Sequence, residues 1–146
     1  MARSDSLWLD PDIILDWLAA RQPWDAAATE IIERAVLGEW VLWISPLTLA
    51  NVHHIYRKHA GATNAMAAIQ TLTSMALIAT MDSSHVRQAI GRGLGDFEDE
   101  MQIACASAVS GLTAIITRNL TDYANSPVLA MTAQTWLEQH PNSVPK

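Results

Sequence analysis

Carboxylate side chains gather at three places in this sequence, each next to an expected strand end or helix start. Asp10 closes the first apolar run, and Asn119 and Asp122 follow the fourth. Four more acids crowd the helix expected just before that fourth run: Asp96, Glu98, Asp99 and Glu100. Ligands of open parallel sheets bind beyond the carboxyl ends of the strands. If the first and fourth strands are neighbours, we expect these acids to share one cleft.

An acidic cleft without a cysteine pair or an HExxH pattern nearby has the chemistry of a hard-cation site. Oxygen ligands suit Mg²⁺ or Mn²⁺, which keep several waters and use one or two carboxylates together with substrate phosphate. Such an ion activates water and stabilises a displaced oxyanion in phosphodiester cleavage. The acids also suit a structural role, because Asp10 and Asp96 stand where helix N-caps are expected. The two interpretations are compatible, since a capping residue can also be a ligand.

Five short runs that are apolar almost throughout predict buried strands, with helical periods between them. The expected strands are residues 7–10, 41–45, 76–80, 114–118 and 128–132. The expected helices begin at Pro11 and Pro46 and also cover residues 25–37, 64–74, 83–94 and 97–109. Strands buried on both faces and separated by helices predict an α/β fold with a central parallel sheet of about five strands. We expect one domain over residues 1–146, with a frayed tail at 138–146.

Composition and charge narrow the class of protein. The formal net charge of −6 argues against a protein whose surface is basic overall, as in many proteins that bind duplex nucleic acid. The single cysteine, Cys105, allows no internal disulfide, and no apolar run approaches the roughly 18 residues that span a membrane. We therefore expect a cytoplasmic protein. For the tryptophans we favour core packing; the alternative is that Trp8 and Trp24 are partly exposed and form a homodimer interface.

Ordered blocks of the sequence resemble the PIN-domain family of metal-dependent ribonucleases, and most of all its bacterial branch of toxin–antitoxin toxins. The blocks are residues 9–16, 44–52, 96–102 and 115–123, and residues 128–137 look like the last strand and helix of the family. The resemblance covers about residues 7–137. It implies a three-layer α/β/α sandwich around a parallel sheet, with a small set of acids that hold Mg²⁺ or Mn²⁺.

The resemblance also implies roles for individual residues. Asp10 stands at the first acidic position of the family and Asp99 at the third, with Asp96 one helical turn earlier. Asn119 lies near the fourth position, and Asp122 follows it. The expected catalytic and metal-binding residues are therefore Asp10, Asp96, Asp99 and Asp122. The residues expected to position substrate or water are Asn51, Thr117, Arg118 and Asn119.

Asn51 departs from the family pattern, which usually has glutamate at this position. Asparagine offers a neutral oxygen but brings no charge and cannot act as a base. Two functions therefore stay open. The first is a Mg²⁺- or Mn²⁺-dependent ribonuclease, the toxin of a toxin–antitoxin pair, with RNA as substrate and an antitoxin protein as partner. The second is a degenerate PIN-like domain that binds RNA or a protein partner without cleaving.

Overall fold

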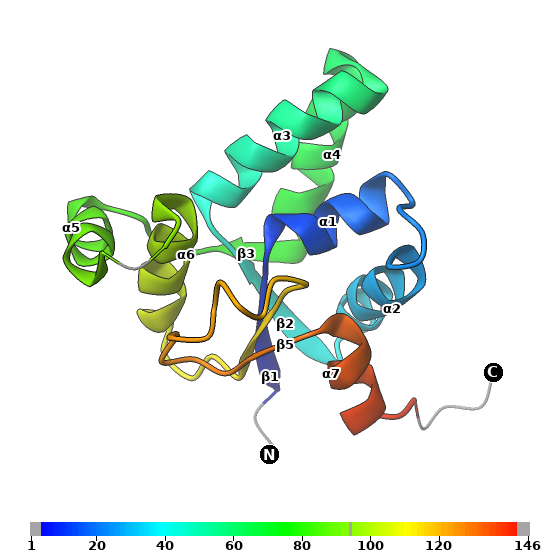
Figure 1. Ribbon diagram of the computed structural model, residues 1–146. Helices are drawn as coiled ribbons and strands as arrows, with labels where there is room; N and C mark the ends of the chain where they lie inside the picture. Colours follow the sequence, from blue (N-terminus) through cyan, green and yellow to red (C-terminus); the bar gives the residue numbers. More distant parts are fainter. Residues whose placement is uncertain (1–3, 94, 143–146) are drawn as a thin grey trace.

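Five parallel strands form the centre of the molecule in the computed structural model, which describes residues 4–93 and 95–142 (Figure 1). The strands are β1 (Asp5–Leu9), β2 (Trp40–Ile44), β3 (Ala76–Ile78), β4 (Ala114–Ile116) and β5 (Ala130–Met131). Their order in the sheet is β3-β2-β1-β4-β5, so β1 lies between β2 and β4. The strand order reverses at β1, and the carboxyl ends of β1 and β4 are therefore neighbours at the place where such sheets bind ligands.

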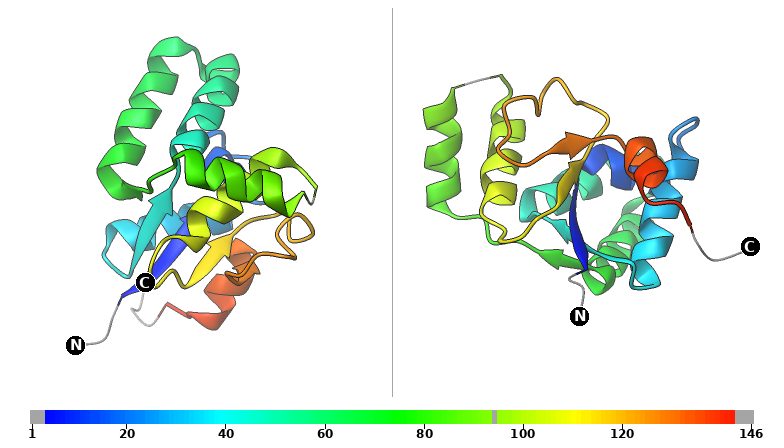
Figure 2. Two further views of the ribbon diagram at one scale, coloured as in Figure 1. Left: turned by 90° about the vertical axis from the view of Figure 1, so that its left-hand side faces the viewer. Right: turned by 90° about the horizontal axis from the view of Figure 1, so that it is seen from below.

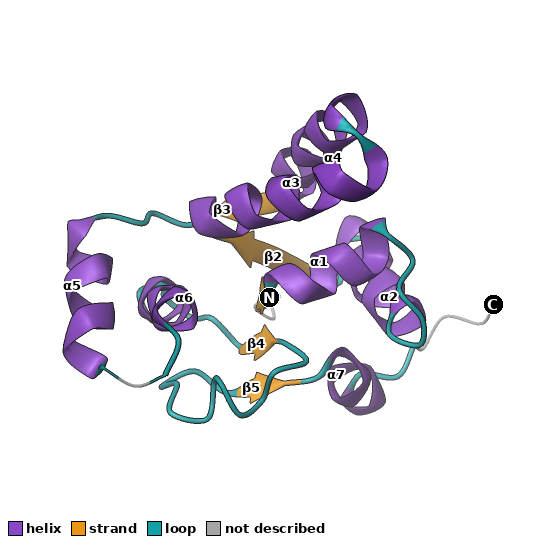
Figure 3. Ribbon diagram, turned by 45° about the horizontal axis from the view of Figure 1, so that its top comes forward, coloured by secondary structure: helices purple, strands orange, loops and turns teal. Residues whose placement is uncertain are grey.

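Seven helices cover the two faces of this sheet within the described residues. They are α1 (Pro11–Leu18), α2 (Asp25–Val36), α3 (Pro46–Ala60), α4 (Ala62–Met75), α5 (Ser83–Arg92), α6 (Phe97–Ser107) and α7 (Ala133–Gln139). Figure 3 shows α5 and α6 on one side of the sheet and the other helices on the opposite side, and Figure 2 shows the same layers from two further directions. The expected three-layer α/β/α sandwich with a parallel sheet is confirmed.

The side chains of β1 pack into two separate hydrophobic cores, one on each face of the sheet, because successive side chains of a strand point in opposite directions. Leu7 and Leu9 pack into the larger core with residues of α1, α2 and α7. Trp8 packs into the smaller core, against Ile103 of α6 and Ile115 of β4. Trp8 is 0% exposed, which confirms core packing for this residue and excludes the alternative of partial exposure, since β1 is the central strand and is covered on both faces.

The ends of the elements differ from the expected ranges by a few residues. β3 and β4 end two residues earlier than predicted, and β5 is shorter at both ends. The last helix, α7, continues to Gln139 and so includes the first two residues of the expected frayed tail, whose residues 143–146 lie outside the described part of the chain. Among the described residues, no helix combines the length and the hydropathy that a membrane crossing requires.

Candidate functional site

Asp10 is the buried centre of the candidate site. It follows β1 directly, and its side chain is only 5% exposed. The hydroxyl of Thr117 donates a hydrogen bond of 2.7 Å to its Oδ2, and the hydroxyl of Tyr123 donates one of 3.3 Å to its Oδ1. Although Asp10 precedes α1, its side chain makes no capping hydrogen bond to that helix. The carboxylate therefore faces the end of β4 instead of serving as the N-cap that its position suggested.

Burial raises the pKa of Asp10 to about 6, and this effect outweighs the hydrogen bond from Thr117, which acts in the opposite direction. The negative charge of Asp12 contributes to this raised value. A buried carboxylate next to another acid binds protons or cations readily, because both neutralise a charge that the surroundings solvate poorly.

The first turn of α6 brings two more expected acids to the same place. Asp96 is the N-cap of this helix, and its Oδ1 accepts a hydrogen bond of 3.1 Å from the backbone N–H of Asp99. The pKa of Asp99 is raised to about 7, mainly by burial and also by the charges of Asp96, Asp122 and Asp10. Asp96 thus serves as a helix cap and also belongs to the acidic group, as the two compatible interpretations allowed.

One surface cleft collects most of the expected residues. It is lined by Asp10, Pro11, Asp12, Asn51, Ile55, Asp96, Glu98, Asp99 and Asn119. Asp122 does not line the cleft, although its charge acts on Asp99. Thr117 lies beneath the cleft, where it contacts Asp10. Asn119 is fixed at the edge of the cleft, because its amide donates a 3.1 Å hydrogen bond to Oδ2 of Asp12.

Glu98 also lines the cleft, although it was not among the expected catalytic, metal-binding or positioning residues. Its Oε1 accepts a hydrogen bond of 3.0 Å from Nδ2 of Asn51, so α3 and α6 meet across the cleft. Its charge also contributes to the raised pKa values of Asp10 and Asp99. In the sequence, Glu98 is one of several acids before Met101, and nothing local distinguishes it from them. Its contact with Asn51 of α3 shows that it faces the cleft.

A buried polar network holds α3 and α6 together next to this contact. The hydroxyl of Ser45 caps α3 by accepting a 3.0 Å hydrogen bond from the backbone N–H of Thr48. The same hydroxyl donates to Oε1 of Gln102 at 2.9 Å, and Nε2 of Gln102 donates to Oγ1 of Thr48 at 2.9 Å. Because the three residues are buried, their hydrogen bonds fix the position of Asn51 relative to α6.

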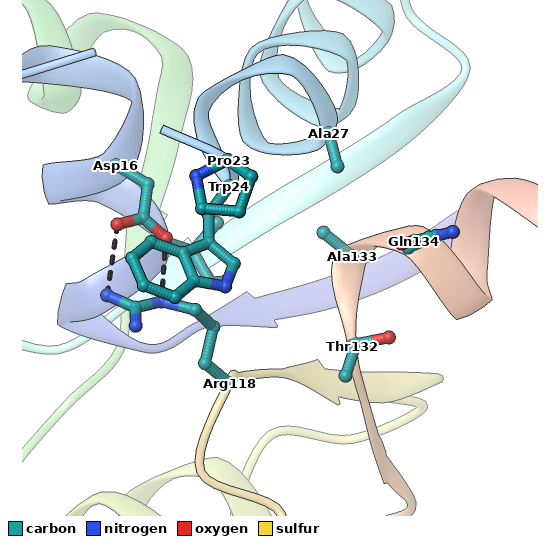
Figure 4. Close-up of a pocket in the computed structure, with 9 residues that line it drawn as sticks. Asp16, Pro23, Trp24, Ala27, Arg118, Thr132, Ala133 and Gln134 are labelled. Carbon is teal, nitrogen blue, oxygen red and sulfur yellow. Dashed lines mark hydrogen bonds and ion pairs between the residues drawn. The ribbon is translucent and has the colours of Figure 1, made fainter. Parts of the chain in front are cut away.

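Arg118, like Asp122, is an expected site residue that does not line the cleft. Its Nε and Nη2 donate to the two carboxylate oxygens of Asp16, at 2.9 and 3.1 Å. The guanidinium also lies 3.9 Å from the ring centroid of Trp24 (Figure 4). Asp16 is 0% exposed, so this ion pair compensates a buried charge. These three residues line a separate pocket between α1, α2 and the start of α7.

The donor atoms of the cleft fit a hard divalent cation. The ionisable side chains that line the cleft are all carboxylates, and the side-chain amides of Asn51 and Asn119 add neutral oxygen atoms. In the described part of the chain, however, no three His, Cys, Asp or Glu side chains are already grouped closely enough to hold an ion. A magnesium-type ion does not require such a group, since it keeps several waters and uses one or two carboxylates with substrate phosphate.

Comparisons with solved structures find the same fold in bacterial toxins. VapC20 of Mycobacterium tuberculosis, described as a sarcin-ricin loop cleaving toxin, has a TM-score of 0.65 at 14% identity, covering 81% of this chain and 93% of that one. A toxin–antitoxin complex from Klebsiella pneumoniae gives 0.64 at 21% identity, covering 87% and 97%. DNA-bound VapBC from Salmonella typhimurium gives 0.63 at 18% identity, covering 88% and 98%. No curated protein matches the sequence.

At these low identities, the solved structures establish only a shared fold. A comparison with family models identifies the family. The model of the PIN domain matches residues 6–121, which is most of the chain and includes the whole acidic cleft. The chain belongs to the PIN domain family.

Proposed function

We propose that this protein is a Mg²⁺- or Mn²⁺-dependent endoribonuclease and the toxin of a toxin–antitoxin pair. The observation that carries the proposal is the pair Asp10 and Asp99, two carboxylates with raised pKa values in one cleft at the carboxyl ends of β1 and β4. Perturbed carboxylates in a cleft are typical of functional sites. The toxins with the same fold, one of them described as cleaving the sarcin-ricin loop, support RNA as the substrate class.

In this proposal, Asp10 and Asp99 hold the ion, with Asp96 and Asp122 close enough to add negative charge. The ion supplies an activated water and stabilises the developing oxyanion. The chain orients these ligands itself: Thr117 and Tyr123 donate hydrogen bonds that fix the Asp10 carboxylate in one direction. Such outer hydrogen bonds set ligand orientation and commonly affect metal affinity or activity by about 10–100-fold.

Cleavage of a mixed RNA substrate in the presence of Mn²⁺ tests the proposal. We expect cleavage by the purified protein, and we expect EDTA to abolish it. Asp10→Asn should reduce the rate by more than about 100-fold, because even the loss of an outer contact costs 10–100-fold. Glu33→Gln, which changes an exposed carboxylate on α2, is the matched control and should cleave normally. Cleavage that persists in EDTA or in Asp10→Asn would refute the proposed site.

A second candidate function is a PIN domain that binds RNA or a protein partner without cleaving. The observation that favours it is Asn51, a neutral side chain whose amide is already engaged with Glu98. Under this alternative, wild-type protein binds RNA equally well with and without Mn²⁺ but leaves it intact. Restoration of cleavage by Asn51→Glu would then identify the missing carboxylate as the cause.

We also propose an antitoxin protein as partner and a homodimer as the assembly. The antitoxin is suggested by fold relatives that were solved as toxin–antitoxin complexes. For the homodimer, Trp24 supplies an exposed aromatic side chain, at 45% exposure, of the kind enriched at interfaces. Light scattering of wild type and Trp24→Ser tests the dimer, which should dissociate in the variant. A monomeric wild type would contradict the proposed assembly.

A further inference from the structure

Charge is distributed very unevenly along this chain. Residues 40–81 contain no aspartate or glutamate. Within this stretch, the hairpin formed by α3 and α4, residues 46–75, contains two cations, Arg57 and Lys58. The hairpin therefore carries a formal charge of +2, and the remainder of the chain carries −8. Together they give the net charge of −6. The hairpin is thus an element with cations and no acid of its own, as is α5 with Arg87 and Arg92, in a molecule whose total charge is negative.

The positive hairpin borders the acidic cleft. Its helices project away from the sheet (Figure 1). Near its start, α3 contributes Asn51 and Ile55 to the lining of the cleft. Ile55 also lines the adjoining hollow, together with Tyr56, His59 and Arg21. The lining therefore continues along α3 from the cleft to Tyr56 and His59. The two cations lie on the same helix six and seven residues after Asn51, about 10 Å along its axis at 1.5 Å per residue.

The two cations of the hairpin are available to a ligand. Both Arg57 and Lys58 are exposed, and within the described part of the chain neither forms an ion pair. Other arginines are committed to carboxylates: Arg34 to Glu30 and Glu39, Arg92 to Glu100, and Arg118 to Asp16. The hairpin also presents aromatic surface, because the rings of Tyr56 and His59 stack with centroids 5.8 Å apart. Unpaired cations next to aromatic rings are the combination that single-stranded nucleic acids contact.

We propose that the surface of α3 from Asn51 to His59 binds the backbone of a single RNA strand and guides it into the acidic cleft. Arg57 and Lys58 neutralise phosphates, and the ring pair of Tyr56 and His59 supports a base. This inference rests on the proposed nuclease function and adds to it the path of the substrate. The acids of the cleft repel phosphate, so a strand that reaches them requires cations close by.

The geometry favours RNA over an acidic segment of a protein as the occupant. The path of about 10 Å equals about three steps of a stacked strand, at 3.4 Å each. It also leads directly to the carboxylates of the cleft. Those carboxylates can share a divalent cation with a phosphate but would repel a run of glutamates, which brings only further carboxylates. An acidic partner that binds here more tightly than RNA would therefore contradict the proposal.

Salt-dependent binding of a labelled oligouridylate of about 12 nucleotides tests the path. The measurement is made in EDTA, so that it does not depend on metal or on cleavage. Each cation that neutralises a phosphate contributes about 0.7 to the slope of log affinity against log salt for a single strand. The double variant Arg57→Gln/Lys58→Gln should therefore lose about 1.4 of the slope and bind at least about tenfold more weakly near 50 mM salt. Arg87→Gln is the matched control and should keep the wild-type slope, because Arg87 is exposed on α5 and forms no ion pair with any described residue.

The outcomes separate this inference from the proposed function. A slope lost in the double variant and kept in Arg87→Gln supports the path. Equal slopes in both variants, in a protein that still cleaves RNA with Mn²⁺, overturn the path and leave the nuclease function standing. Displacement of the RNA from wild type by polyglutamate at equal charge concentration would overturn the choice of RNA. If wild type binds no RNA in any salt, the path and the RNA substrate both fail.

Discussion

Replacing Asp10 with asparagine is expected to stabilise the metal-free protein at alkaline pH but not at acidic pH. In the folded protein, burial raises the pKa of Asp10 from 3.8 to about 6. Above the folded pKa, the ionised carboxylate therefore destabilises the fold by about 3 kcal/mol, at 1.36 kcal/mol per pH unit. Between the two pKa values the folded state binds more protons than the unfolded state, so stability decreases as the pH rises through this range. Below 3.8 both states are protonated and the cost disappears.

The substitution also weakens the hydrogen bonds that Asp10 accepts from Thr117 and Tyr123, which together are worth about 1–2 kcal/mol. Asp10→Asn should therefore be more stable than wild type by about 1–2 kcal/mol near pH 8, and no more stable near pH 4.5. Between these conditions, the difference in unfolding free energy between the two proteins should change by about 2 kcal/mol.

Urea unfolding in EDTA at several pH values measures this difference directly. Glu33→Gln removes an exposed carboxylate on α2 and controls for the general effect of net charge. Its unfolding free energy should differ from that of wild type by a nearly constant amount over the same range. If the difference between Asp10→Asn and wild type is equally constant, burial does not perturb Asp10, and the physical basis of the proposed site is wrong.

Three further predictions concern the cleft and its surroundings. Mn²⁺ should raise the melting temperature of wild type, by the equivalent of about 2.7 kcal/mol at 100 times the dissociation constant, and Asp99→Asn should lose most of this increase in a thermal scan. Asn51→Glu places a carboxylate beside Glu98, so calorimetric titration should show tighter Mn²⁺ binding and urea should show a less stable metal-free protein; unchanged affinity would exclude Asn51 from the site. Arg118→Met leaves Asp16 buried with weaker compensation, so unfolding should cost about 3 kcal/mol less while Mn²⁺ affinity stays the same.

The sequence predicted three acids of the cleft because each stands at a boundary between elements. Asp10 follows an apolar run, and Asp96 and Asp99 open a helix, so their backbone positions followed from local pattern alone. Family resemblance added Asn51, whose place on α3 lines the cleft as expected. Local pattern and resemblance thus located the residues whose backbone lies at the ligand-binding edge of the sheet.

The remaining differences arise from packing, which local pattern does not specify. Arg118 immediately follows Thr117, but the hydroxyl of Thr117 contacts Asp10 while the guanidinium of Arg118 contacts Asp16. Asp16 then determines where Arg118 goes, through a contact between residues 102 positions apart. Trp8 is buried because β1 is central, and strand order is not visible in the sequence of a single strand.

The buried network of Ser45, Thr48 and Gln102 has a consequence for local opening of the molecule. Separating α3 from α6 would expose several buried hydrogen-bonding groups at once, so the two walls of the cleft open only together with the loss of the cap at Ser45. The backbone amide hydrogen of Thr48 is part of that cap. Its exchange with deuterium in solvent therefore reports cleft opening, and it should be among the slowest of α3.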